Sequence, residues 1–326
     1  MHPAFSVIFL TTLLGVGQGL FLALYTGQIY SLLELLPLQD SRAFHATGAA
    51  ISLLFLTAGL VASFFHLGHP ERAWRTATKW RTSWLSREVI VLPLFMGAVF
   101  LYGAAHWFDW SAALFTLPGG HPVDATLILG GIATLFAFAL FVCTAMIYAC
   151  LRFLQEWHTP LTVINYILLG GASGFMLASA LAAVAAPEVL RFYAGWTVVI
   201  TLLGFASRAA SLIRNARLRR KSTLQTAIGV KHPRIEQKSQ GFMGGSFNTR
   251  EFFHGRTASF LRSVKWIFLL LTFPLPLLLL IYGVTALSAV LLFAAFAVQY
   301  AGLIAERWFF FAQANHPQNL YYQTVS

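Results

Sequence analysis

Several apolar segments of about 20 residues, with almost no charged side chain inside them, constrain this chain more than any other feature. A helix of that length rises about 30 Å, which matches the hydrocarbon core of a bilayer. The sequence is 58% hydrophobic and only 10% charged, and its mean hydropathy is +0.70. These values indicate an all-α integral membrane protein and exclude an ordinary water-soluble domain.

A bundle of about eight transmembrane helices is predicted, at residues 7–33, 47–68, 88–107, 125–151, 161–185, 192–213, 264–284 and 286–305. The division between the last two is open, because one nearly uncharged stretch runs from Lys265 to Glu306. Two helices in this stretch require a tight turn near Tyr282 and Gly283. The alternative is seven spans with a long, tilted last helix.

Charge divides the chain into three regions. Residues 1–213 form a predicted six-span bundle that holds the candidate site, and residues 264–326 form a final two-span hairpin with a polar tail. Residues 214–263 form a basic loop whose stretch GFMGGSFNTREFFHG combines glycines with four phenylalanines. A purely solvated loop does not need these aromatic residues, so the loop is predicted to dock a protein partner.

The distribution of lysine and arginine predicts the orientation in the membrane. Of the 22 such residues, 20 lie on the side of the two termini, and only Arg42 and Arg191 lie on the other. The positive-inside rule therefore places both termini and the docking face in the cytoplasm of a bacterium, with the chain in its inner membrane. The net charge of +11 favours contact with anionic membrane lipids or an acidic partner surface. Nucleic acid is not an expected partner, since no soluble domain is present to bind it.

Several classes of chemistry lack their motifs in this sequence. It contains no P-loop, dinucleotide fingerprint, HExxH motif or nucleophile elbow. Cys143 and Cys150 lie in one predicted span without the ligands that an iron–sulfur cluster or a zinc site requires, and are interpreted as small packing residues. The predicted span centres hold almost no ionisable side chain, which disfavours a secondary transporter, the alternative from a different functional class.

Ionisable residues gather instead between the second and third spans, in FHLGHPERAWRTATKWRTSWLSREVIVLPLF, residues 65–95. A quinone bound at this depth requires hydrogen-bond partners for its carbonyl groups and a route for two protons. His66 and Glu88 are candidates for proton transfer because both exchange protons and bracket one short loop. Arg72, Arg87 and, from the first span, Gln18 are candidate binding residues.

Structural explanations for the same residues stay open. Ser86 as the N-cap of the third span would place Glu88 in the first turn, where the helix dipole favours a carboxylate without any function. The arginines can act as topology determinants, and Arg87 can pair with Glu88 or hold a partner. Gln18 is expected to face the bundle interior, because an amide in lipid requires a hydrogen-bond partner.

Two further features of the predicted spans have more than one interpretation. The glycines of GVGQG, residues 15–19, indicate close helix packing, and the alternative is room for a ligand ring. His45 and His106 lie at neighbouring span ends and are the histidines that could pair on haem b. Haem b is therefore a possible cofactor, but the sequence favours a quinone over it.

The opening MHPAFSVIFLTTLLGVGQGL, the segment HLGHPERAWRTATKWRTSWLSREV and the eight predicted spans resemble the membrane anchors of dimethyl-sulfoxide-reductase-type molybdoenzymes. This is the DmsC-like family, related to NrfD and PsrC anchors, and the resemblance covers essentially the whole chain. It implies an oxidoreductase subunit without a metal cluster, which joins an iron–sulfur subunit and a molybdopterin catalytic subunit to the menaquinone or ubiquinone pool. The family's quinol-site glutamate and histidine match Glu88 and His66.

Members of this family dock their partners on the face that carries the termini and the 69–87 loop, which the charge count places in the cytoplasm. That orientation, with the long basic loop, implies an anchor similar to the sulfite dehydrogenase (SoeC-like) branch, where electrons pass from sulfite to quinone. The alternative within the family is the anchor of a dimethyl-sulfoxide or polysulfide reductase, which oxidises quinol. A purely structural anchor is the remaining hypothesis.

Overall fold

The computed structural model describes residues 1–118, 120–238 and 250–322. In this part of the chain, strands are confined to the antiparallel pair β1 (Phe115–Thr116) and β2 (Pro122–Val123). The long helices are α1 (Phe5–Leu32), α2 (Thr47–Phe64), α3 (Trp84–Trp107), α4 (Ala125–Ala149), α5 (Pro160–Ala185), α6 (Leu190–Ala216), α9 (Ala258–Thr272), α10 (Pro274–Thr285) and α11 (Ala289–Ala312). The shorter elements are η1 (Ser41–Ala46), η2 (Pro70–Lys79), η3 (Pro187–Val189), α7 (Leu224–Ile228) and η4 (Pro317–Tyr321).

The predicted bundle of eight spans is confirmed, since eight helical segments are long and apolar enough to cross a membrane. Helices α9 and α10 form one of them, interrupted where Pro274 follows Phe273, because proline cannot donate a backbone hydrogen bond. The final turn lies at residues 286–288, slightly later than predicted. Leu287 has a φ of 51° there, and Ser288 caps α11 by accepting a hydrogen bond from the backbone N–H of Leu291.

Several helices extend beyond their predicted ends. Helix α3 begins at Trp84 rather than at residue 88, and α11 continues to Ala312 rather than ending at residue 305. The prediction ended each span where charge appears in the sequence. In α11 the charged residues Glu306 and Arg307 are buried, 1% and 5% exposed, so the helix continues through them.

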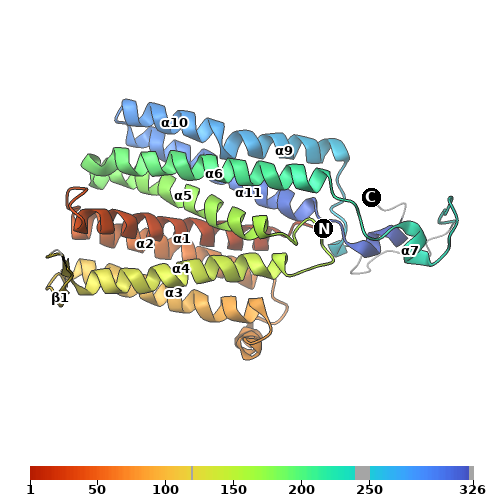
Figure 1. Ribbon diagram of the computed structural model, residues 1–326, viewed down its shortest axis with the longest axis horizontal. Coiled ribbons are helices and arrows are strands. Elements are labelled where there is room, and N and C mark those ends of the chain that lie inside the picture. The colour runs from red at the N-terminus through yellow and green to blue at the C-terminus, as the bar shows by residue number, and fades with distance from the viewer. Residues whose placement is uncertain (119, 239–249, 323–326) are drawn as a thin grey trace.

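Helices α1 and α5 form the centre of the bundle (Figure 1). Within their apolar windows, 72% and 78% of residues are buried, against 28% to 44% in the other six spans. The two backbones touch, because a Cβ added to Gly174 would lie 1.9 Å from the carbonyl carbon of Gly19. Close packing of the glycine-rich part of the first span is thereby confirmed.

One end of the bundle is closed by the N-terminus, residues 214–238 and 250–257, and residues 313–322, while β1 lies at the other end (Figure 1). The Met1 amine donates to the Ala314 carbonyl at 2.7 Å, and the His2 N–H donates to the Glu251 carbonyl at 2.8 Å. The Tyr321 hydroxyl donates to the Ala227 carbonyl at 2.5 Å. Three distant parts of the sequence therefore form one connected surface.

Candidate functional site

The start of α3 is fixed by two serines. The Ser83 hydroxyl accepts a hydrogen bond from the Ser86 N–H at 3.3 Å, so Ser83 is the N-cap. The Ser86 hydroxyl donates instead to the Thr76 carbonyl, which ties α3 to η2. The interpretation of Ser86 as the cap is therefore wrong.

Glu88 lies in the second turn of α3 and is only 6% exposed. Its Oε1 accepts a hydrogen bond of 2.5 Å from the hydroxyl of Thr144, which lies in the last two turns of α4. The carboxyl group thus points into the contact between α3 and α4, not toward the start of its own helix. A capping role for Glu88 is wrong. A carboxyl group buried within a membrane span, with one hydroxyl as its hydrogen-bond partner among the described residues, is a candidate functional group.

Of the two candidate arginines, Arg72 lies exposed in η2, and Arg87 lies half-buried in the first turn of α3. Arg87 Nε and Nη2 donate to the carbonyl groups of Trp80 and Arg81, each at 2.9 Å, and its guanidinium lies 4.1 Å from the centre of the Trp84 ring. Arg87 therefore does not pair with Glu88 as the sequence allowed. Arg72 Nε lies 3.6 Å from Oε1 of the exposed Glu71. Solvent screens this contact, so it holds the arginine side chain only weakly. Ligand binding by either arginine stays a prediction.

His66 lies on the exposed turn that follows α2. Partial burial lowers the pKa of its imidazole below the ordinary value, so the ring is mostly neutral at neutral pH. Among the described residues no hydrogen bond or ion pair joins His66 to Glu88. The structure thus places Glu88 inside the bundle and His66 on its rim, and a shared role in proton transfer stays a prediction.

Gln18 faces the bundle interior as predicted, with 2% of its surface exposed. Its amide donates to the Ala137 carbonyl at 2.9 Å. Gln18 and Thr144 line the same small cavity among α1, α4, α5 and α11, of about 20 Å³. Thr144 therefore contacts both this cavity, which Gln18 also lines, and the carboxyl group of Glu88.

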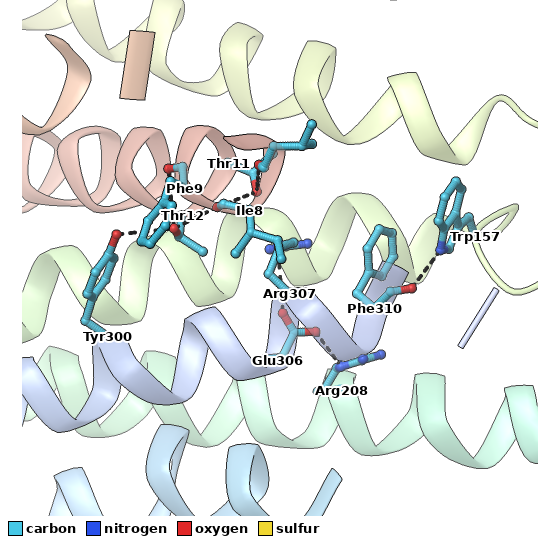
Figure 2. A network of polar contacts seen from close by, with 11 residues as sticks. Ile8, Phe9, Thr11, Thr12, Trp157, Arg208, Tyr300, Glu306, Arg307 and Phe310 are labelled. Carbon is cyan, nitrogen blue, oxygen red and sulfur yellow. Dashed lines mark hydrogen bonds and ion pairs between the residues drawn. The ribbon is translucent and has the colours of Figure 1, made fainter. Parts of the chain in front are cut away.

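A buried group of charges was missed by the sequence analysis. Arg208 Nε lies 2.7 Å from Glu306 Oε1, and Arg307 Nε lies 3.8 Å from Glu306 Oε2 (Figure 2). The Arg307 guanidinium also lies 3.8 Å from the centre of the Tyr166 ring. We refer to Arg208, Glu306 and Arg307 as the buried triad.

The predicted spans place Glu306 and Arg307 just beyond the last span, where charge is common, and Arg208 in the last two turns of the span at residues 192–213. Their side chains are instead buried, among contacts that include Tyr166 of α5 and Phe268 of α9. The available signal was the sequence FFFA, residues 309–312, because an apolar run after Glu306 and Arg307 indicates that the helix continues into the bundle.

The opposite end of the bundle contains the two histidines considered for haem. The rings of His45 and His106 stack with centres 4.5 Å apart and an interplanar angle of 16°. His45 Nδ1 lies 3.1 Å from the Tyr102 hydroxyl, and His106 Nδ1 lies 3.2 Å from the Ser41 hydroxyl. Rings stacked face to face cannot place their nitrogens on opposite sides of one iron, so this arrangement does not fit haem ligated by both.

The aromatic residues of the basic loop are partly described. Phe252 stacks on His316 with ring centres 3.9 Å apart, and Phe253 contacts Tyr322 at 6.0 Å. These two phenylalanines therefore pack on the chain's own tail, while Phe242 and Phe247 lie outside the described residues. Within the described ranges, no group of three His, Cys, Asp or Glu side chains could hold a metal ion.

Two comparisons with known proteins agree with this architecture. The family model described as "DMSO reductase anchor subunit (DmsC)" matches residues 1–313. A protein of Allochromatium vinosum, described as a subunit of sulfite dehydrogenase, is 60% identical over 326 residues, covering 100% of both chains.

Proposed function

Because the chain belongs to the DMSO reductase anchor subunit (DmsC) family, we propose that it is the quinone-reactive membrane anchor of a sulfite-oxidising complex. The observation that carries this proposal is the full-length identity of 60% to a subunit of sulfite dehydrogenase, together with a carboxyl group buried at the basic end of the bundle. Its partners are an iron–sulfur subunit and a molybdopterin catalytic subunit, which pass electrons from sulfite toward the quinone pool.

The residues around Glu88 fit a quinone oxygen in their chemistry. A bound quinone supplies two-electron, two-proton redox chemistry. Glu88 holds a proton within a largely apolar contact and delivers it at Oε, where the Thr144 hydroxyl stabilises the remaining carboxylate. His66, on the exposed rim, exchanges protons with water, and Arg72 and Arg87 at the same end of the bundle attract an anionic partner surface.

The proposed orientation places this end of the bundle in the cytoplasm of a bacterium whose inner membrane holds the chain. It is supported by the lysine and arginine count and by the packing of the N-terminus, basic loop and tail at one end. This connected surface is the proposed docking face for the iron–sulfur subunit, with residues 1–213 and 264–326 forming the membrane part.

A second candidate is an anchor that oxidises quinol for a dimethyl-sulfoxide or polysulfide reductase. The description of the matching family model favours it, since that description names DMSO reductase. The same proton-carrying residues serve both directions, so the partner enzyme decides between them.

The proposal is tested by purifying the tagged chain from membranes of its native host and assaying the co-purified subunits. We expect iron–sulfur and molybdenum-containing chains and sulfite-dependent quinone reduction. Glu88→Gln should lower this turnover at least about 100-fold, because it removes the proton carrier. Glu71→Gln removes an exposed carboxylate from η2 and should leave the turnover unchanged. Full turnover in Glu88→Gln would refute the proton role, and isolation of an active reductase would favour the second candidate.

A further inference from the structure

The small cavity beside Thr144 is lined by residues of four helices, several of them polar. Its lining includes Thr11, Gln18, Thr144, Tyr166 and Arg307, and Figure 2 shows Thr11 of α1 and Arg307 of α11 in one view. Its volume of about 20 Å³ exceeds the roughly 10–15 Å³ that one water molecule requires. It is far too small for a quinone ring.

Two donors on the cavity wall lack a hydrogen-bond acceptor among the described residues, because the ion-pair contact of Arg307 Nε with Glu306 Oε2, at 3.8 Å, is too long for a hydrogen bond. The Tyr166 hydroxyl and Arg307 Nε make no hydrogen bond of normal geometry to any described residue, although the two side chains touch. Both residues are almost completely buried, at 4% and 5% exposed. A buried donor without a hydrogen-bond acceptor costs about 1–3 kcal/mol, so two of them on residues that line one cavity indicate a bound acceptor.

We propose that this cavity is a binding site for one ordered water molecule that links the buried triad to Glu88. The water accepts hydrogen bonds from Tyr166 Oη and Arg307 Nε and donates one to Thr144 Oγ1. Thr144 must use its own hydrogen for Glu88, so its oxygen is free to accept. Three partners are the usual number for a buried water.

In this arrangement every hydrogen bond points toward Glu88. Arg307 and Tyr166 polarise the water, the water polarises the Thr144 hydroxyl, and that hydroxyl donates to the carboxylate. The triad contains two guanidinium groups and one carboxylate, so its net charge of one positive unit lies at the far end of this chain of hydrogen bonds. Arg307 and Tyr166 are thus positioning residues that stabilise Glu88 after it has given up its proton. This role rests on the proposed function, whereas the water site itself does not.

The site is tested first without any assay of activity. A high-resolution electron cryomicroscopy map of the complete complex should show density in the cavity, within about 3.2 Å of Tyr166 Oη, Arg307 Nε and Thr144 Oγ1. The Tyr166→Phe complex should lose this density, because one of its three partners is removed. An empty cavity in the parent complex, in a map that resolves other internal waters, would overturn the proposal.

Turnover then tests the positioning role. Tyr166→Phe should lower kcat for quinone reduction about fivefold and leave KM for quinone unchanged, as expected for loss of one hydrogen bond in the chain. Tyr193→Phe is the matched control, because the Tyr193 hydroxyl is also buried without a partner among the described residues but does not line this cavity.

The outcomes separate this inference from the proposed function. Unchanged kcat in Tyr166→Phe, with turnover lost in Glu88→Gln, would overturn the positioning role and leave the proton role of Glu88 intact. Full turnover in both variants would refute the proposed function, and the map would still decide whether the water is bound.

Discussion

Arg208 and Glu306 join α6 to α11 through a contact of 2.7 Å, and each side chain is 2% exposed. A buried ion pair rarely stabilises a protein more than apolar residues of the same size, because both charges lose their hydration. Arg307 beside this pair makes the total charge positive rather than zero. Stability alone therefore does not explain the triad, which agrees with the role near Glu88 proposed for Arg307.

The triad predicts unequal effects of removing its members. Glu306→Gln leaves two buried guanidinium groups without a carboxylate and should lower the free energy of unfolding by about 3–5 kcal/mol. Arg208→Leu should cost less, because Arg307 still neutralises Glu306. The measurement is the unfolding of the detergent-solubilised complex, and a larger loss in Arg208→Leu would show that Arg307 does not compensate.

The number of spans was predictable because the bilayer imposes a length on each apolar segment. Span ends were less predictable, since charge in the sequence does not distinguish a surface residue from a paired internal one. Glu306 and Arg307 were placed at an end for this reason. Their partner Arg208 lies on another helix, and only the folded bundle brings it within 2.7 Å of the carboxylate.

The candidate site was predictable to a similar degree. Glu88 is the carboxylate at the start of an apolar segment, so its unusual position is visible in the sequence. Its partner Thr144 lies 56 residues away. Threonines are common in membrane helices, where their hydroxyl groups bond the preceding turn, so nothing in the sequence singles out this one.

Thr144 provides a test of the contact with Glu88. Thr144→Val keeps the shape of the side chain but removes the hydroxyl that donates to the carboxylate. Because a hydrogen bond to a charged group contributes about 1.5–3 kcal/mol, we expect kcat to fall at least about tenfold. Thr144→Ser retains the donor and should restore most of the turnover. A loss in Thr144→Ser as large as in Thr144→Val would show that the hydroxyl alone does not account for the effect.

The contact between α1 and α5 predicts opposite effects for two glycine substitutions. Gly174→Ala places a methyl group 1.9 Å from the Gly19 carbonyl carbon, so the two central helices must separate. We expect a loss of about 1–3 kcal/mol, as for other overpacked contacts. In α6, a Cβ on the exposed Gly195 meets nothing within 4 Å, so Gly195→Ala should be neutral or stabilise by up to about 1 kcal/mol. Equal unfolding temperatures for the two variants would contradict this assignment.

The N-terminal amine predicts a pH dependence of stability. Burial lowers the pKa of this group from 8.0 to about 6, and the nearby Glu156 opposes part of the effect. Between these values the unfolded chain binds a proton that the folded chain does not, so stability falls as the pH decreases from 8 to 6 and is constant below 6. Two pKa units correspond to about 2–3 kcal/mol, an upper value because the amine is partly solvated.

A Gly-Ser extension before Met1 isolates the contribution of the N-terminal amine to the pH dependence of stability. The extended amine is solvated in both states, so its pKa no longer changes on folding. Burial and the neighbouring amine also lower the pKa of His254 and His316, and the extension relieves the second of these causes. The unfolding temperature of the parent complex should therefore fall more steeply from pH 8 to pH 6 than that of the extended one. Parallel curves would show that the amine is not buried against Ala314.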